Sequence, residues 1–208
     1  WDGRELTFNS AYRAPAAGPR SALIQVHLAG ICSTDLHIFK GYMSFEGVPG
    51  HEFVGSVSDG PGELIGKRVA GEINFGCGQC DACRQDSSRH CPNRSVMGIL
   101  NADGAFAECV SVPLENLHVV PDNVSDEEAV FTEPLAAAFE ILQQVRIEPG
   151  VGCVVLGDGK LGLLAAQVLA AAGARVLAVG RHADKLALLR RRDIATTTLD
   201  GWDRARVP

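Results

Sequence analysis

Four cysteines within fifteen residues constrain this chain more than any other feature. Cys77, Cys80, Cys83 and Cys91 follow the spacing CxxCxxCx₇C, which suits tetrahedral coordination of one Zn²⁺ by four thiolates. We call these four residues the cysteine ladder. The ladder predicts a closed structural zinc site that determines the path of this segment.

Two other interpretations of the ladder conflict with the rest of the chain. A disulfide cluster needs an oxidising compartment, but the chain shows no secretory signal and has an odd total of seven cysteines. A zinc finger that reads nucleic acid would be attracted to phosphate, but the formal net charge is −6, which has the wrong sign. We therefore expect no nucleic-acid partner and a reducing, cytoplasmic location.

The apolar segments of the chain predict a globular protein rather than a membrane protein. The runs 151–156 and 161–172 are shorter than the roughly 20 residues that a helix needs to cross a bilayer. With 208 residues and 46% hydrophobic content, the chain can bury a core in one or two domains. We expect no membrane partner.

The character of the sequence changes near residue 147. Residues 1–147 contain short apolar segments between Gly, Pro and Asp turn signals. These predict strands near 22–28, 52–57, 68–73 and 107–112. Residues 148–208 instead alternate strand and helix patterns, near 153–156, 160–172, 175–179 and 183–191. This predicts a β-rich domain over 1–147, followed by the opening of a parallel α/β domain.

A glycine-rich turn joins the first strand and first helix of the α/β part. Gly157 permits the tight turn, Gly159 lets the backbone approach a pyrophosphate, and Gly162 lets the helix pack close to the strand. The amino end of the helix would then face the phosphates. The whole GxGxxG turn comprises Gly157, Asp158, Gly159, Lys160, Leu161 and Gly162. It predicts dinucleotide binding; the alternative is a turn that only permits helix packing.

The end of the next strand indicates which dinucleotide is bound. An NAD-selective site usually has an acid there, which binds the ribose 2′-hydroxyl. This chain has Gly180 and then Arg181, with His182 and Lys185 nearby. Since a cation suits the 2′-phosphate of NADP, we expect NADP to be preferred over NAD. Alternatively, Arg181 stacks on the adenine or faces solvent.

A second set of metal-binding residue types lies upstream of the ladder. Cys32 and His51 are nineteen residues apart, and Glu52 follows. A Cys, a His and a carboxylate from separated segments can form an open zinc site, which leaves one position for water or substrate. A lone Cys or His is more often a packing residue. The prediction therefore depends on their occurrence together with the ladder and the glycine turn.

The motifs together resemble those of the zinc-dependent medium-chain dehydrogenase/reductase superfamily, which includes the alcohol dehydrogenases. In order they are CxTDxH at 32–37, GHExxG at 50–55, the ladder, a Thr132–Glu133–Pro134 segment and GxGxxG. The first and fourth resemble the threonine and sorbitol dehydrogenase branches. The resemblance implies a GroES-like catalytic domain over 1–147 and part of a Rossmann domain over 148–208.

The resemblance also implies two zinc ions per chain, one in the ladder and one catalytic. Cys32 and His51 would bind the catalytic ion, and either Glu52 or Glu133 would supply a carboxylate. Substrates would be small alcohols or polyols, or the matching carbonyl compounds. A hydride would pass between the substrate and NAD(P).

Three residues of the CxTDxH segment have supporting roles in such a site. Asp35 would orient the zinc-binding histidine. Thr34 would take a proton from the substrate, and His37 would pass it to solvent. These are the candidate catalytic residues of the chain.

The end of the chain raises a question about activity. A complete member continues through a six-strand Rossmann sheet, whereas this sequence stops at Pro208. We expect a fragment that is inactive alone, from a protein that forms a homo-oligomer at full length. The alternative is a truncated, non-catalytic zinc-binding protein that acts as an interaction or regulatory module. A third interpretation is a zinc-free quinone reductase of the same fold. The presence of the ladder and Cys32 argues against it, because such a protein would need neither.

Overall fold

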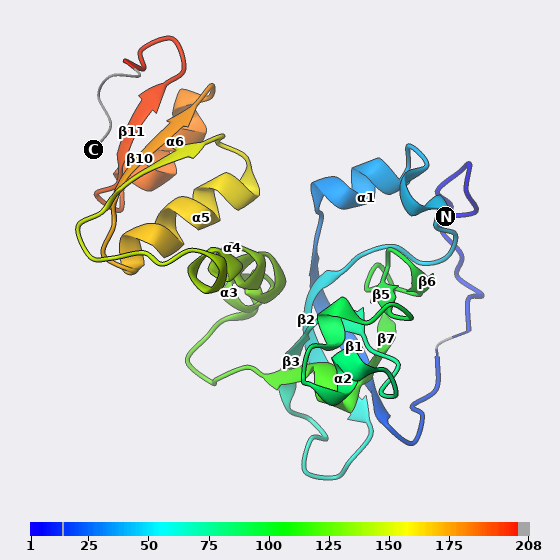
Figure 1. Ribbon diagram of the computed structural model, residues 1–208. Coiled ribbons are helices and arrows are strands. Elements are labelled where there is room, and N and C mark those ends of the chain that lie inside the picture. Colours follow the sequence, from blue (N-terminus) through cyan, green and yellow to red (C-terminus); the bar gives the residue numbers. More distant parts are fainter. Residues whose placement is uncertain (14, 204–208) are drawn as a thin grey trace. The chain divides into compact units, whose positions relative to one another are not determined.

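The computed structural model describes residues 1–13 and 15–203. Residues 14 and 204–208, which include the end of the predicted second domain, lie outside the described residues. The chain divides into two compact units, Trp1–Glu133 and Pro134–Pro208 (Figure 1). No helix of the described part is both long and apolar enough to span a membrane.

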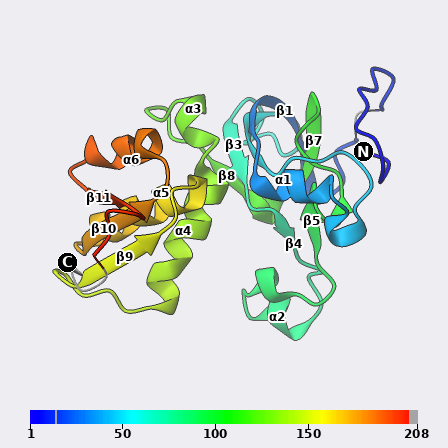
Figure 2. The same cartoon turned by 90° about the horizontal axis from the view of Figure 1, so that it is seen from above.

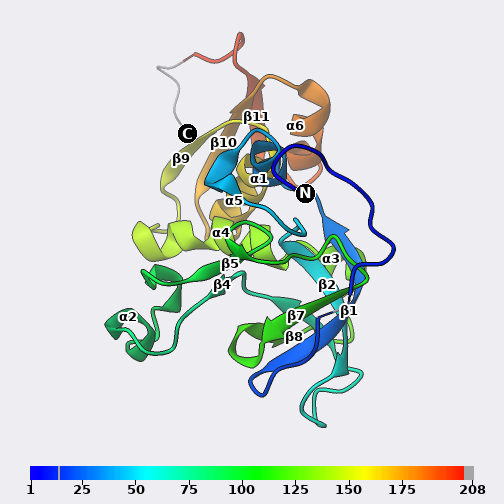
Figure 3. The same ribbon diagram turned by 90° about the vertical axis from the view of Figure 1, so that its right-hand side faces the viewer.

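An antiparallel five-stranded sheet with the order β7-β1-β2-β3-β8 forms the centre of the first unit. Its strands are β1 (Ser21–Gly30), β2 (Glu52–Asp59), β3 (Arg68–Gly71), β7 (Cys109–Pro113) and β8 (Leu117–Val119). Figure 3 shows β1 beside β7. Ala22 and Ile24 of β1 are fully buried with Val110 and Val112 of β7, because alternate residues of a strand face the same side.

A smaller sheet and several short helices complete this unit. The sheet has the order β4-β5-β6, with β4 (Asn74–Phe75), β5 (Ser95–Met97) and β6 (Asn101–Ala102). The α-helices are α1 (Ser33–Ile38), α2 (Asp81–Arg84) and α3 (Asp126–Ala129), and the 3₁₀ turns are η1 (Tyr42–Ser44), η2 (Ser88–His90) and η3 (Leu114–Asn116). Figure 2 shows α2 in a loop that projects from the sheets. This loop carries the ladder.

The second unit contains the predicted βαβ arrangement. Parallel strands in the order β11-β10-β9 alternate with two helices. The elements are β9 (Gly152–Leu156), α5 (Lys160–Ala171), β10 (Arg175–Gly180), α6 (Ala183–Arg190) and β11 (Ala195–Thr198). Leu169 of α5 and Leu186 of α6 share one buried cluster with Val176 of β10, so both helices pack against the sheet. The predicted strands and helices are confirmed here.

The two units divide inside a helix that the sequence analysis did not predict. Helix α4 spans Thr132–Gln144, and the units divide after its second residue. The domain boundary near residue 147, in the loop between α4 and β9, stays a prediction. Its apolar side chains Leu135, Ala138 and Ile141 pack with Val168 of α5, which places most of α4 in the second unit. The spacing of these residues by three is a helical signal.

Candidate functional site

The cysteine ladder brings its four sulfur atoms together, all within 4.8 Å of one another. Cys80 Sγ lies 3.5 Å from Cys83 Sγ and 3.7 Å from Cys91 Sγ. Sulfurs held about 2.3 Å from a central zinc at tetrahedral angles would be about 3.8 Å apart, whereas a disulfide bond is about 2.05 Å long. The thiols are free and fit one tetrahedral metal ion, not a pair of disulfides.

Backbone amides donate hydrogen bonds to the sulfur atoms of the ladder. Cys77 N and Asn93 N lie 3.4 Å and 3.3 Å from the buried Cys91 Sγ. Amide groups of Gln79 and Cys80 lower the pKa of the Cys77 thiol to about 6. Since zinc binds thiolates, amides that stabilise the ionised sulfur favour metal binding.

A second cluster in the first unit consists of Cys32, His51 and Glu52. One ligand atom from each lies within 4.8 Å of the others. Cys32 is the N-cap of α1, His51 precedes β2, and Glu52 begins it. His51 is 3% exposed and Glu52 is 2% exposed. A half-buried thiol placed with a buried imidazole and a buried carboxylate is the donor set of an open zinc site.

Two positions next to this cluster have no space for a side chain and are occupied by glycine. Gly30 pairs with Glu52 across β1 and β2, and a Cβ on Gly30 would lie 2.5 Å from Glu52 Oε2. Gly50 has a φ of +98°, and a Cβ there would lie 2.5 Å from the ring of Phe106. Glycine at these positions therefore lets the chain turn into His51 and lets the Glu52 side chain lie over β1.

Asp35 lies beneath the cluster and is fully buried. Its Oδ2 accepts a 2.7 Å hydrogen bond from Cys32 N. Its Oδ1 lies 3.2 Å from His51 Nδ1, but the two atoms are not aligned for a hydrogen bond. Neither atom has a hydrogen-bond partner among the described residues. Burial lowers the pKa of His51, but Asp35, with Cys32 and Glu133, raises it to about 9. With Nδ1 facing Asp35, Nε2 is the ring nitrogen left for a metal.

The other predicted site residues surround this cluster at different depths. Glu133, in the first turn of α4, is half-buried and raises the pKa of His51, but it lies outside the three-residue cluster. Thr34 Oγ1 accepts from the Cys32 thiol across 3.7 Å. His37 is exposed on α1, three residues after Thr34 and therefore on the same helix face. Their catalytic roles stay predictions.

The glycine turn of the second unit has space for a ligand. Gly157 has a φ of +118°, and a Cβ on Gly162 would lie 2.3 Å from the Gly157 carbonyl oxygen, so both positions favour glycine. A Cβ on Gly159 would meet no atom within 4 Å. The amino end of α5 follows directly. An open backbone at a helix amino terminus fits a pyrophosphate.

Asp158 is a residue of this turn to which the sequence analysis gave no role. Its side chain is buried and accepts hydrogen bonds from Arg181 N at 2.7 Å and His182 N at 2.5 Å. The ring of His182 also contacts it, with Nδ1 at 3.0 Å. These donors, with His182 first and Arg181 after it, hold the pKa of Asp158 well below its usual range. The carboxylate therefore joins the turn after β9 to the turn after β10.

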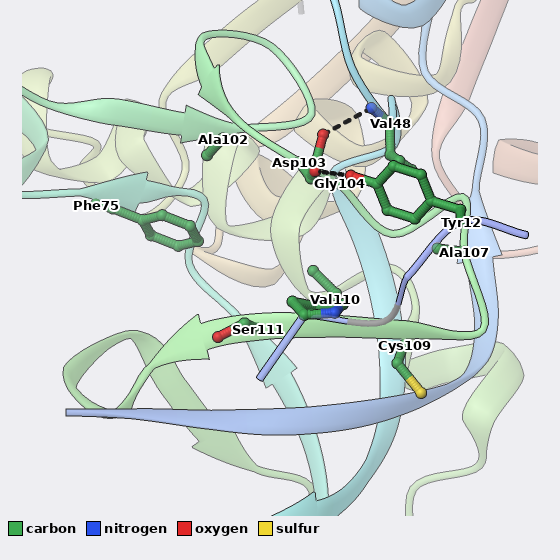
Figure 4. Close-up of a pocket in the computed structure, with 11 residues that line it drawn as sticks. Tyr12, Val48, Phe75, Ala102, Asp103, Gly104, Ala107, Cys109, Val110 and Ser111 are labelled. Atoms are coloured by element: carbon green, nitrogen blue, oxygen red, sulfur yellow. Dashed lines mark hydrogen bonds between the residues drawn. The ribbon is translucent and has the colours of Figure 1, made fainter. Parts of the chain in front are cut away.

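A separate hollow in the first unit, of about 230 Å³, contains none of the predicted site residues (Figure 4). Tyr12 donates a hydrogen bond to Asp103 at its edge, and this bond raises the pKa of Tyr12 to about 12. Asp103 also accepts from Val48 N at 2.8 Å. Because Tyr12 and Asp103 already bond within the protein, we do not place the functional site in this hollow.

Comparisons with known proteins identify the family of the chain. Residues 18–122 match the family model described as alcohol dehydrogenase GroES-like domain. The chain is 33% identical over 86% of its length to a sorbitol dehydrogenase of Halalkalibacterium halodurans. It is 36% identical over 79% of its length to an L-threonine 3-dehydrogenase of Chelativorans sp.. The chain belongs to the medium-chain dehydrogenase/reductase superfamily.

Solved structures of other superfamily members have the same fold. A putative zinc-binding dehydrogenase from Sinorhizobium meliloti bound to NADP superposes with a TM-score of 0.82 at 33% identity, over 91% of this chain and 57% of that one. An alcohol dehydrogenase from Thermus sp. ATN1 gives a TM-score of 0.83 at 34% identity, over 95% and 61%. The predicted fold class, a GroES-like domain followed by the first part of a Rossmann domain, is confirmed. The chain spans about half the length of the two curated relatives, 54% and 50%.

Proposed function

We propose that the protein is a zinc-dependent oxidoreductase that transfers a hydride between an alcohol or polyol, or the matching carbonyl compound, and NAD(P). One observation carries the proposal: Cys32, His51 and Glu52 meet in a buried cluster with Asp35 directly behind the histidine. The names of the relatives, a sorbitol and a threonine dehydrogenase among them, support the substrate class.

The residues of the buried cluster would hold the catalytic zinc. Cys32 Sγ, the Nε2 atom of His51 and a Glu52 carboxylate oxygen are the proposed ligands, with Glu133 as the alternative carboxylate. When bound, the metal would supply Lewis acidity at the substrate oxygen. Asp35 would keep the His51 ring in one orientation and one tautomer.

Thr34 and His37 would move the proton. The Thr34 hydroxyl lies beside Cys32, so it is placed to accept the proton of a substrate hydroxyl near the same sulfur. His37 is exposed on the same helix and can exchange a proton with water, since an imidazole changes its charge near neutral pH. In the reverse reaction the two residues would return the proton to the substrate oxygen.

The second unit would bind the dinucleotide through its glycine turn. Gly157, Gly159 and Gly162 with the amino end of α5 would receive the pyrophosphate, flanked by Lys160 and Leu161. Arg181 would face the 2′-phosphate, so we propose NADP as the preferred cofactor. The relative from Sinorhizobium meliloti is described as bound to NADP, which supports this choice.

Metal analysis of the 208-residue chain tests the central claim. The chain, purified under reducing conditions without chelator, should contain two zinc ions, one per cluster. Cys32→Ser should contain one. Cys109→Ser, which removes a thiol outside both clusters, is the matched control and should keep two. Two zinc ions in the Cys32→Ser variant would show that the catalytic metal is not held here.

A turnover assay tests the rest of the proposal. A protein that carries this chain and the remaining length of its relatives should oxidise members of a polyol panel with NADP⁺ in preference to NAD⁺. Full turnover in its Cys32→Ser variant would contradict the mechanism. All seven thiols are free, which suits a reducing compartment, so we expect this protein in the cytoplasm. Separately, we expect the full-length protein to form a homo-oligomer.

A further inference from the structure

The carboxylate of Asp158 occupies the space next to Gly180, where the second strand of the α/β unit ends. A Cβ built on Gly180 would lie 2.6 Å from both Asp158 Cβ and Asp158 Oδ2. Real side chains do not approach so closely, so no acid at position 180 could coexist with Asp158 in this arrangement. The acid of this region is thus supplied by the glycine turn and not by the strand end.

The hydrogen-bonding capacity of Asp158 is used within the protein. Oδ2 accepts from Arg181 N and His182 N, and His182 Nδ1 lies 3.1 Å from Oδ1 and 3.0 Å from Oδ2. The residue is only 7% exposed. A carboxylate so enclosed is poorly placed to accept a ribose hydroxyl, which is what the strand-end acid of an NAD site does.

The two residues whose amides bind Asp158 have exposed side chains, a guanidinium and an imidazole. Arg181 is exposed, and the His182 side chain is 50% exposed. The bonds from Asp158 fix the backbone of both residues at the carboxyl end of β10. A segment fixed before binding does not pay the cost of becoming ordered when a ligand arrives.

We propose that Asp158 is a positioning residue for NADP selectivity: by binding the Arg181 and His182 amides, it holds the guanidinium of Arg181 and the imidazole of His182 ready for the 2′-phosphate. This inference rests on the proposed dinucleotide function. Asp158 itself touches no cofactor atom in this scheme. It acts through Arg181 and His182.

Removing Asp158 should change the affinity for a 2′-phosphate in opposite directions, depending on whether Asp158 acts through its hydrogen bonds or only through its charge. A carboxylate that acted only through its charge would repel a 2′-phosphate, so removing it would strengthen binding. A positioning carboxylate has the opposite effect, since its removal releases the two amides and weakens binding. Asp184, an exposed acid in the first turn of α6, carries the same charge nearby without these bonds.

The test measures binding of two cofactor fragments to the 208-residue chain by calorimetry: adenosine 2′,5′-bisphosphate, which has the 2′-phosphate, and AMP, which lacks it. Asp158→Ala should lower the affinity for the bisphosphate about tenfold relative to AMP. Asp158→Asn keeps one acceptor oxygen for the amides and should give an intermediate loss. Asp184→Ala, the matched charge control, should give no loss.

Amide hydrogen exchange provides a readout that needs no ligand. In the Asp158→Ala variant, the Arg181 and His182 amides should exchange faster, while amides in the middle of β9 should not change. If Asp158→Ala does not fold, the Asp158→Asn variant tests the same bonds with the side-chain volume retained.

The outcomes distinguish the two proposals. A wild-type chain that binds AMP as well as the bisphosphate would contradict the NADP preference and this inference with it. A wild-type preference for the bisphosphate that is unchanged or increased in the Asp158 variants would overturn only the positioning role. So would an equal loss for both fragments, which would indicate a general defect of the turn.

Discussion

The two cysteine-containing clusters of the first unit are built in opposite ways. The ladder takes all four sulfurs from residues 77–91, in a projecting loop, and three of its four cysteines are only half-buried. The other cluster draws Cys32 from the start of α1, and His51 and Glu52 from the start of β2, and its imidazole and carboxylate are buried. The geometry of the ladder therefore depends on one loop, whereas the geometry of the other cluster depends on the pairing of β1 with β2.

This difference indicates which perturbations each site should tolerate. We expect that a metal site within one loop can lose its ion with little change to the five-stranded sheet. A site assembled across β1, α1 and β2 depends on glycines, register and a buried carboxylate that bind no metal themselves. Four substitutions test this contrast, from the largest expected effect to the smallest.

Cys91→Ser should have the largest effect, because it removes the most buried ladder sulfur, which two backbone amides contact. We expect the ladder to lose its zinc, since structural sites need all four thiolates and their binding free energy is of order 10 kcal/mol. Metal analysis should show one zinc ion in place of two. A variant that keeps two would show that the ladder is not a four-thiolate site.

Gly50→Ala should disturb the buried cluster without reaching the ladder. The new Cβ would lie within 2.8 Å of the Phe106 backbone nitrogen, at a φ of +98°. We expect a loss of about 3 kcal/mol in unfolding free energy, measured by urea denaturation. Gly41→Ala is the control: its φ is +90°, but its Cβ would meet no atom within 4 Å, so the loss should be about 1 kcal/mol.

Asp35→Asn should weaken the buried metal site selectively. Outer partners of metal-binding histidines typically contribute about 10- to 100-fold in affinity, and Asp35 Oδ1 lies 3.2 Å from His51 Nδ1. Competition with a chelator should release one zinc ion more readily from the variant, while the other stays bound as in the wild type. Equal weakening of both ions would indicate a general loss of structure instead.

Asp126→Asn should have the smallest effect, and only above acidic pH. Arg68 and then His27 lower the pKa of Asp126, with Arg68 Nη1 at 2.8 Å from Oδ1. Since the folded pKa lies below the unfolded value of about 3.9, this stabilisation exists above that pH and is lost as pH falls through the folded pKa.

The measurement for Asp126 is the difference in unfolding free energy between wild type and variant as a function of pH. It should be at most about 1 kcal/mol near neutral pH, because the pair is partly exposed, and should vanish under strongly acidic conditions. Zinc in the ladder should not respond. A difference that grew as pH fell would contradict the assigned sign.

Much of the second unit could be predicted from sequence because its signals are local. Strand, glycine turn and helix follow one another between residues 152 and 190, so periodicity and turn chemistry are sufficient there. Helix α4 was missed, although Leu135, Ala138 and Ile141 follow a helical spacing. Thr132, Glu133 and Pro134 form the first turn of this helix, so the family motif and the start of the helix coincide.

The sequence by itself determined the ladder, the glycine turn and the set of residue types at the buried cluster, because these depend on spacing along the chain. Only the tertiary structure decided that Glu52 lies within 4.8 Å of both Cys32 and His51. It also decided that Asp158 binds amides twenty-three and twenty-four residues away. Such contacts arise from strand register and from the approach of neighbouring turns, and no local sequence pattern encodes those distances.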